Sequence, residues 1–167
     1  TVEEMIRVSD LSGITPIARV PENNPKTILR VLEMGTQGIQ VPHIEGVEDA
    51  KRAVAAGSYS PIGERGDAGR TRTAGYGSVS WSEHMRTSNE EILPTVMTKD
   101  QRGLDEIEQI AAVDGVDLIA LGPTDICAAL GITDPPDPRL RQTFQELVAK
   151  VKAYVPVNHS ALRFSPS

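Results

Sequence analysis

The sequence predicts an α/β fold of the (β/α)8 barrel type that is incomplete, with about strands three to seven present. Short apolar runs alternate along the 167 residues with longer amphipathic segments, which is the pattern of repeated strand–helix units. The apolar runs are nearly continuous, as in parallel strands that helices bury on both faces. Five such runs occur, and a closed barrel needs eight strands. We therefore expect residues 1–167 to form a single partial barrel domain.

Each predicted strand is followed by a predicted helix. The strands are the apolar runs at residues 14–20, 38–44, 92–98, 116–123 and 154–158. The helices are the amphipathic segments at residues 1–13, 23–35, 46–58, 100–113, 126–131 and 140–153, and residues 161–167 begin another. Residues 60–90 are rich in Gly, Arg, Thr and Ser, so we expect them to be mostly loop.

Capping residues support several of these helix boundaries. Asn24 is a candidate N-cap, Pro25 takes the first helical position after it, and Gly35 follows the last apolar residue of the same helix. Gly13 ends the first helix in the same way. The segment 100–113 keeps its helical pattern despite an internal glycine.

The composition excludes several classes of function. A net charge of −6 argues against binding to nucleic acid or to an anionic membrane, because both need a basic face. The single Cys127 excludes an internal disulfide framework, is typical of a reducing cytoplasm, and is expected to pack as a small hydrophobe. No apolar run approaches the roughly 20 residues of a membrane span. A phosphate loop of the GxGxxG type is absent, which disfavours a doubly wound nucleotide-binding fold. We expect a soluble, cytoplasmic domain.

The stretch LIALGPTDICAALG, residues 118–131, places a carboxylate between a buried strand and a helix. Barrel enzymes carry their active sites at the carboxyl ends of the strands, so Asp125 is a candidate functional residue. The free N–H groups and positive dipole end of the helix form an anion site, and a carboxylate beside it can coordinate a hard cation. The alternative is that Asp125 only caps the helix ICAALG. The spacing alone does not decide between the two.

Two long runs of the sequence resemble a known family. They are PIARVPENNPKTILRVLEMGTQGIQVPHIEGVEDAKRAVAAGSYSPIGERGDAG and LDEIEQIAAVDGVDLIALGPTDICAALG, the second of which matches a GPxDLxxxLG signature. Together they resemble the middle of the HpcH/HpaI aldolase/citrate lyase family, in particular its class II, metal-dependent pyruvate aldolases of the 2,4-dihydroxyhept-2-ene-1,7-dioate aldolase type. The resemblance runs from about residue 2 to the end.

The resemblance implies a (β/α)8 barrel that assembles as a hexamer and cleaves 4-hydroxy-2-oxo acids to pyruvate and an aldehyde. In the family, a divalent metal, Mg²⁺ or Mn²⁺, chelates the 2-oxo acid through its carboxylate and keto oxygens. The metal and an arginine then stabilise the pyruvate enolate. The expected partners are a small 2-oxo acid such as pyruvate and further copies of the chain, with no nucleic acid and no membrane.

The resemblance also assigns roles to residues at the strand ends. Arg19 corresponds to the arginine that stabilises the enolate, which suits a permanently charged, forked donor. Asp125 corresponds to a metal ligand. Backbone N–H groups around Thr124 and Asp125 are expected to hold the substrate carboxylate. The substrate-binding residues implied by the resemblance are Gly122, Pro123, Thr124 and Thr95, the last in the place of a family glutamine.

The third predicted strand departs from the family pattern. Where the family has Gln-Ile-Glu-Thr, this chain has Thr-Val-Met-Thr at residues 95–98. Met97 thus replaces the glutamate that binds the metal, and a thioether does not replace a carboxylate for a hard ion. Asp100 could supply a carboxylate only if its loop folded back. The family's Asp-x-Glu-His segment, whose histidine takes part in acid–base catalysis, has no counterpart within residues 1–167.

Other polar residues gain no role from the resemblance. His43 and Glu45 follow the second strand, and Asn158 and His159 follow the fifth, where a structural role is the simpler interpretation. Three arginines make the loop 63–77 locally basic, which suits either an acidic substrate or an oligomer contact: Arg65, Arg70 and Arg72.

The leading interpretation is a carbon–carbon lyase scaffold with Arg19 and Asp125 in its active site. One alternative is a catalytically impaired or truncated relative that binds a small carboxylate or has a structural role only. Another is an enzyme in which His43 or Glu45 replaces the lost metal ligand.

Overall fold

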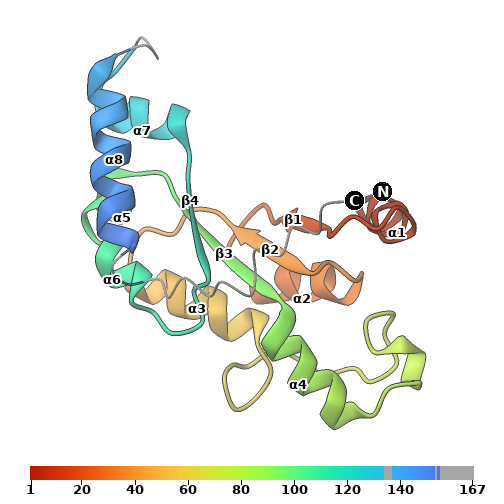
Figure 1. Ribbon diagram of the computed structural model, residues 1–167. Helices are drawn as coiled ribbons and strands as arrows, with labels where there is room; N and C mark the ends of the chain where they lie inside the picture. Colours follow the sequence, from red (N-terminus) through yellow and green to blue (C-terminus); the bar gives the residue numbers. More distant parts are fainter. Residues whose placement is uncertain (134–136, 153, 155–167) are drawn as a thin grey trace.

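The computed structural model of the chain describes residues 1–133, 137–152 and 154. Within them lies a four-stranded parallel sheet of β1 (Ile17–Arg19), β2 (Gly38–Val41), β3 (Leu93–Thr98) and β4 (Leu118–Leu121). The strands lie side by side in the order in which they occur in the chain (Figure 1). A doubly wound sheet reverses its strand order at a switch point, whereas a barrel adds each strand beside the previous one. The strand order therefore favours a barrel segment.

Helices connect the strands and follow the last one. They are α1 (Val2–Leu11), α2 (Pro25–Glu33), α3 (Val47–Gly57), the short 3₁₀ turn η1 (Gly75–Gly77), α4 (Trp81–Glu91), α5 (Gln101–Asp105), α6 (Ile107–Ala111), α7 (Pro123–Ala129) and α8 (Pro138–Lys152). In the described part of the chain, none of these helices has the length and apolar character that crossing a membrane requires.

The main core lies between the sheet and the helices α2, α3 and α6. Successive side chains of a strand point to opposite faces, and one face of β2 and of β3 supplies buried residues to this core. The core residues on the strands or directly after them are Val20, Ile39, Val41 and Val96, and those on the helices are Ile28, Leu32, Ala50, Ala53, Val54, Ala56 and Ile110. A smaller cluster joins α5, α6, α7 and α8.

The opposite face of the sheet is exposed to solvent at its two outer strands, β1 and β4. Ile17 on β1 keeps 52% of its surface exposed, and Leu118 on β4 keeps 45%. In a closed barrel this face is the interior, filled by layers of side chains from all strands. The exposed apolar residues therefore agree with a barrel of which this chain forms one part.

Most of the predicted elements are confirmed, with shorter strands than the apolar runs suggested. Asn24 caps α2 as predicted, because its Oδ1 accepts hydrogen bonds from the backbone N–H groups of Lys26 and Thr27 at 2.9 and 3.2 Å. The predicted helix 100–113 is instead two short helices, α5 and α6, that meet at Glu106. The predicted strand 154–158 and the helix start 161–167 lie outside the described residues, apart from Tyr154.

The prediction of loop over residues 60–90 is wrong for its last third, which forms α4. Ser80 caps this helix by accepting from the Glu83 N–H, and Arg86 forms ion pairs with Glu83 and Glu90. The helix is polar on most sides and buries only His84, so it lacks the apolar stripe that identifies a helix in sequence. Figure 1 shows α4 at the end of the sheet where β3 begins.

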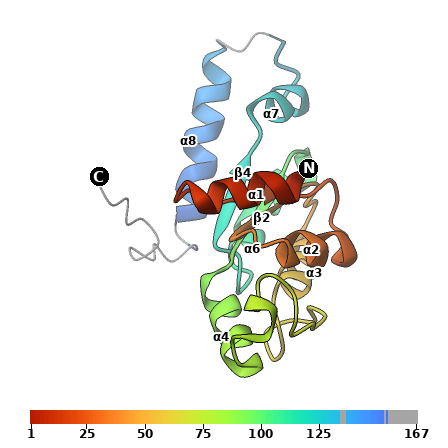
Figure 2. The same cartoon turned by 90° about the vertical axis from the view of Figure 1, so that its right-hand side faces the viewer.

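The first helix packs less than its apolar spacing predicts. Thr1 and Glu4 form a capping box at its start, which explains why the helix begins there. Ile6 is buried, whereas Met5 and Leu11 are 71% and 90% exposed. Figure 2 shows α1 lying across the front of the sheet, apart from the layer formed by α2 and α3.

Candidate functional site

The carboxyl ends of the four strands form one edge of the sheet, and the predicted site residues lie along it. Arg19, Gln40 and Thr95 are in register on neighbouring strands and share the face that becomes a barrel interior. Met97 lies one step further toward the carboxyl end of β3 on the same face. Thr95 and Met97 are buried, whereas Arg19 is exposed. Two strand spacings, about 10 Å, separate the backbones of Arg19 and Thr95.

Asp125 lies in the first turn of α7, not at its cap. The helix begins at Pro123, three residues earlier than predicted, and Gly122 is its N-cap. The Asp125 side chain makes no capping hydrogen bond, so the interpretation of Asp125 as a simple N-cap is wrong. An acid in the first turn still benefits from the positive end of the helix dipole.

Gly122 allows two side chains from different elements to meet. A Cβ atom at this position would lie 2.5 Å from Oδ2 of Asp125 and 3.1 Å from Cε of Met97. Any larger residue at position 122 would therefore displace one of them. The close approach explains the glycine and brings Met97 and Asp125 together, as the strand order predicts.

Lys99 is the residue of this edge that sequence reasoning missed. It follows β3 directly, and its Nζ lies 3.8 Å from Oδ2 of Asp125. The Lys99 side chain is only 17% exposed and that of Asp125 is 40% exposed, so the pair is partly shielded from water. Its position in the sequence could have identified it, because a lysine two residues beyond Met97 lies on the same face and at the same edge as the candidate site.

The other proposed ligands stay away from Asp125. Asp100 caps α5, where its Oδ1 accepts from the Gly103 N–H at 2.8 Å, so its loop does not fold back. His43, with a left-handed φ of 58°, and Glu45 are both exposed. Among the described residues, no three His, Cys, Asp or Glu side chains gather as a metal site would require. Cys127 is half-buried in α7 with a free thiol. Asn158 and His159 fall outside the described residues.

Two of the three loop arginines, Arg65 and Arg72, lie away from the carboxyl edge. Arg65 and Arg72 line a cavity with residues 35–37, which lead into β2, and with Ile92, which leads into β3. That cavity lies at the amino ends of the strands. An acidic substrate at the carboxyl edge would therefore be out of their reach.

Comparison with known proteins identifies the family of this chain. The HpcH/HpaI aldolase/citrate lyase family matches the chain over residues 1–155. The chain belongs to this family. The 5-keto-4-deoxy-D-glucarate aldolase of Salmonella newport (strain SL254) is 38% identical to it over 144 residues, which are 86% of this chain and 56% of the relative. The chain thus spans just over half the length of this curated relative.

Solved structures support the fold. A family protein from Burkholderia cenocepacia J2315 superposes with a TM-score of 0.83 at 32% identity, covering 92% of this chain and 62% of that protein. The citrate synthase SbnG superposes with a TM-score of 0.80 at 30% identity, covering 92% of this chain and 58% of that protein. The α/β architecture therefore matches a portion of an HpcH/HpaI barrel.

The HpcH/HpaI family is generally metal-dependent, but the side chains around Asp125 do not fit a divalent metal. Mg²⁺ and Mn²⁺ take oxygen ligands, usually with more than one from the protein. Here Met97 offers a thioether, and the Lys99 ammonium occupies the position of a counter-ion to Asp125. A second cation beside Asp125 would be repelled by the first. No step of the chemistry below is therefore assigned to a metal.

Proposed function

We propose that this chain is part of a carbon–carbon lyase that binds a small 2-oxo acid, such as pyruvate, at the carboxyl edge of its sheet. The proposed reaction cleaves 4-hydroxy-2-oxo acids to pyruvate and an aldehyde. The observation that carries the proposal is the alignment of Arg19, Thr95 and Asp125 along this edge in a chain of the HpcH/HpaI family. An aldolase and a citrate synthase, both of which act on carbon–carbon bonds, are among its relatives.

The chemistry requires positive charge near the 2-oxo acid. When the bond between C3 and C4 breaks, its electron pair moves into the 2-oxo group and produces an enolate, while the C4 hydroxyl gives its proton to a base and becomes the aldehyde. The enolate then takes up a proton at C3 and becomes pyruvate. Arg19 is the proposed stabiliser of the enolate oxygen. Lys99 is the second cation of this edge, with its Nζ 3.8 Å from Oδ2 of Asp125.

The substrate carboxylate is proposed to bind between β3 and α7. The backbone of Gly122, Pro123 and Thr124 forms the start of α7, and Thr95 supplies a buried hydroxyl on the neighbouring strand. Asp125 then orients Lys99 toward the ligand, in place of the metal-binding role that the resemblance implied. The prediction that Asp125 binds Mg²⁺ or Mn²⁺ can be tested by the Mn²⁺ titration described in the Discussion.

A second candidate function is the binding of a small carboxylate without turnover. The replacement of a family glutamate by Met97 and the engagement of Asp125 by Lys99 favour it. In both cases we propose a homo-oligomer, by analogy with the family hexamer. The exposed apolar residues Ile17 and Leu118 need a cover, which further chain segments or copies would provide.

The deciding experiment measures binding and turnover separately. Calorimetry with pyruvate, with and without Mn²⁺, reports binding, and a lactate dehydrogenase-coupled assay reports pyruvate release from a 4-hydroxy-2-oxo acid. A lyase releases pyruvate and loses this activity in Arg19→Ala, while the exposed Arg52→Ala on α3 is the matched control. Binding without release supports the second candidate. If pyruvate binds neither to the chain nor to its oligomer, both proposals fail.

A further inference from the structure

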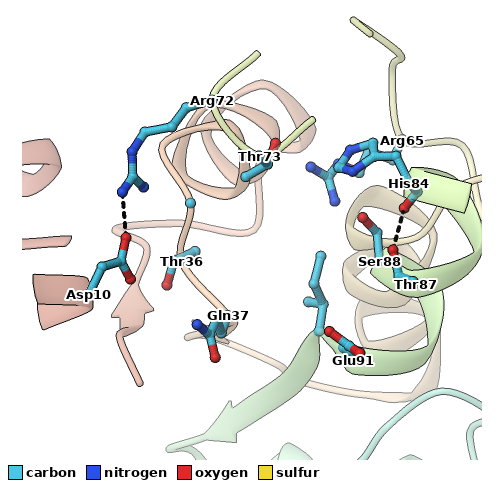
Figure 3. A pocket seen from close by; sticks show the side chains of 12 residues that line it. Asp10, Thr36, Gln37, Arg65, Arg72, Thr73, His84, Thr87, Ser88 and Glu91 are labelled. Atoms are coloured by element: carbon cyan, nitrogen blue, oxygen red, sulfur yellow. Dashed lines mark hydrogen bonds and ion pairs between the residues drawn. The ribbon is translucent and has the colours of Figure 1, made fainter. Parts of the chain in front are cut away.

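A cavity of about 550 Å³ opens at the amino ends of β2 and β3, at the opposite edge of the sheet from the proposed lyase site. Its walls come from segments far apart in the sequence: the loop that carries Arg65 and Thr73, the turn before β2, and one side of α4 (Figure 3). Because none of the residues assigned to the lyase site lines this cavity, a ligand here would serve a separate purpose.

The cavity contains a buried arginine that has no partner within the described residues. Arg65 keeps only 6% of its surface exposed. Its Nε, Nη1 and Nη2 atoms are each buried and make no hydrogen bond to the described part of the protein. Figure 3 shows the guanidinium reaching into the cavity toward Thr73. A buried charge that lacks both a counter-ion and hydrogen-bond acceptors is strongly unfavourable, so such groups are normally paired.

The aromatic neighbours of Arg65 hold it in place without neutralising it. Its guanidinium carbon lies 4.4 Å from the ring centroid of Tyr59, a cation–π contact that fixes the direction of the fork. The Tyr59 hydroxyl is 3.3 Å from Nε2 of His84. Burial, and then the Arg65 charge, lower the pKa of His84, so this imidazole is neutral at pH 7 and adds no further charge.

The acidic residues around the cavity are engaged elsewhere or remain apart from Arg65. Asp10 pairs with Arg72, which also donates to the Met34 carbonyl at 2.9 Å. Glu91, at the end of α4, lines the cavity but forms no ion pair with Arg65. Glu33 acts on Arg65 only through its more distant charge. The guanidinium fork therefore faces an open space instead of a carboxylate.

We propose that this cavity binds a small oxyanion, and that its ligand is a phosphate group. Arg65 is the principal donor, and the hydroxyls of Thr73 and Ser88 are further donors from the loop and from α4. A guanidinium fork matches two oxygens of a phosphate, and hydroxyls on other sides suit the remaining oxygens of a tetrahedral ion. The cavity has room for more than the ion alone, so the phosphate can be free or part of a phosphate monoester.

The test titrates the protein with inorganic phosphate and with glycerol 3-phosphate by calorimetry at constant ionic strength. We expect one site per chain, and Arg65→Gln should weaken binding about tenfold or more, because a charge-assisted contact is lost. The matched control is Arg70→Gln, which removes an exposed arginine of the same loop. Tighter binding of glycerol 3-phosphate than of inorganic phosphate identifies a monoester as the ligand, and the reverse identifies the free ion.

A gain-of-charge variant keeps the proposal testable if Arg65→Gln does not fold. Ser88→Glu places a carboxylate in the cavity beside Arg65, so it should abolish phosphate binding and raise the melting temperature. Asp125→Ala, at the other edge, should leave phosphate binding unchanged. The proposal is overturned if the wild type shows no saturable binding or if Arg65→Gln binds phosphate as tightly as the wild type. It is also overturned if Asp125→Ala removes the binding, because the phosphate would then occupy the lyase site.

Discussion

Lys99 should compete with a divalent metal for Asp125, so removing it should increase metal binding. The Nζ to Oδ2 distance is 3.8 Å, at which two unit charges attract by about 4 kcal/mol at an effective dielectric constant of 20 and by about 1 kcal/mol in water. Asp125 is 40% exposed, so solvent screening puts the pair near the lower end, at about 1–2 kcal/mol. Because that energy no longer opposes a metal, Lys99→Ala should bind Mn²⁺ roughly five- to thirtyfold more tightly.

The assay is a Mn²⁺ titration followed by electron paramagnetic resonance of the free ion. Lys99→Ala/Asp125→Ala should return to the wild-type affinity, because the freed carboxylate is gone. Lys26→Ala, which removes an exposed lysine on α2, corrects for the change in net charge. The reasoning is refuted if Lys99→Ala binds Mn²⁺ no better than Lys26→Ala, or if the double variant keeps the gain.

Three further predictions concern stability and are measured by urea unfolding. Gly103→Ala should lower the free energy of unfolding by about 1–3 kcal/mol despite the better helix propensity of alanine, because its Cβ would overlap Oγ1 of Thr98 and lie 2.6 Å from a backbone carbonyl. Gly57→Ala, whose Cβ would only make a van der Waals contact with Cδ1 of Ile39 at 3.4 Å, should be neutral or stabilising. Burial lowers the pKa of His84, so its contribution to stability is full above the unfolded pKa of about 6.5 and declines as the pH falls below it. His84→Gln should flatten this decline below about pH 6.5. Asn24→Ala should cost about 1 kcal/mol, since two backbone N–H groups of α2 lose their acceptor.

The order of strands and most helices could be predicted because burial imposes a pattern on them. The apolar runs at 38–44 and 92–98 contain β2 and β3, and Asn24 marks the start of α2 through capping chemistry that is local. Helix α4 could not be found in this way, because ion pairs on its surface and a single buried residue, His84, hold it in place. A helix without an apolar stripe has no periodic signal in the sequence.

The edge of the candidate site could be predicted, but the contacts within it could not. Parallel strands place Arg19, Thr95 and Asp125 at the same edge whatever their side chains do. Which residue meets Asp125 depends on the path of the chain after β3, and there the Lys99 side chain approaches Asp125 in the first turn of α7. Arg65 likewise reads as an ordinary basic residue of a loop, and its burial emerges only when the loop packs on Tyr59.

The replacement of the family glutamate by Met97 is consistent in charge with the pairing of Asp125 and Lys99. In the metal-dependent relatives that the resemblance describes, a glutamate, an aspartate and a divalent cation sum to zero. In this chain Met97 removes one negative charge, and the single remaining carboxylate, Asp125, faces the single ammonium of Lys99, which also sums to zero. A buried or half-buried site tolerates a substitution of a charged ligand only when the remaining charges stay balanced. Restoring the glutamate alone, as Met97→Glu, would therefore leave one excess negative charge and draw Lys99 into a three-membered ion pair. Met97→Glu together with Lys99→Ala is the variant in which a metal site is electrostatically complete.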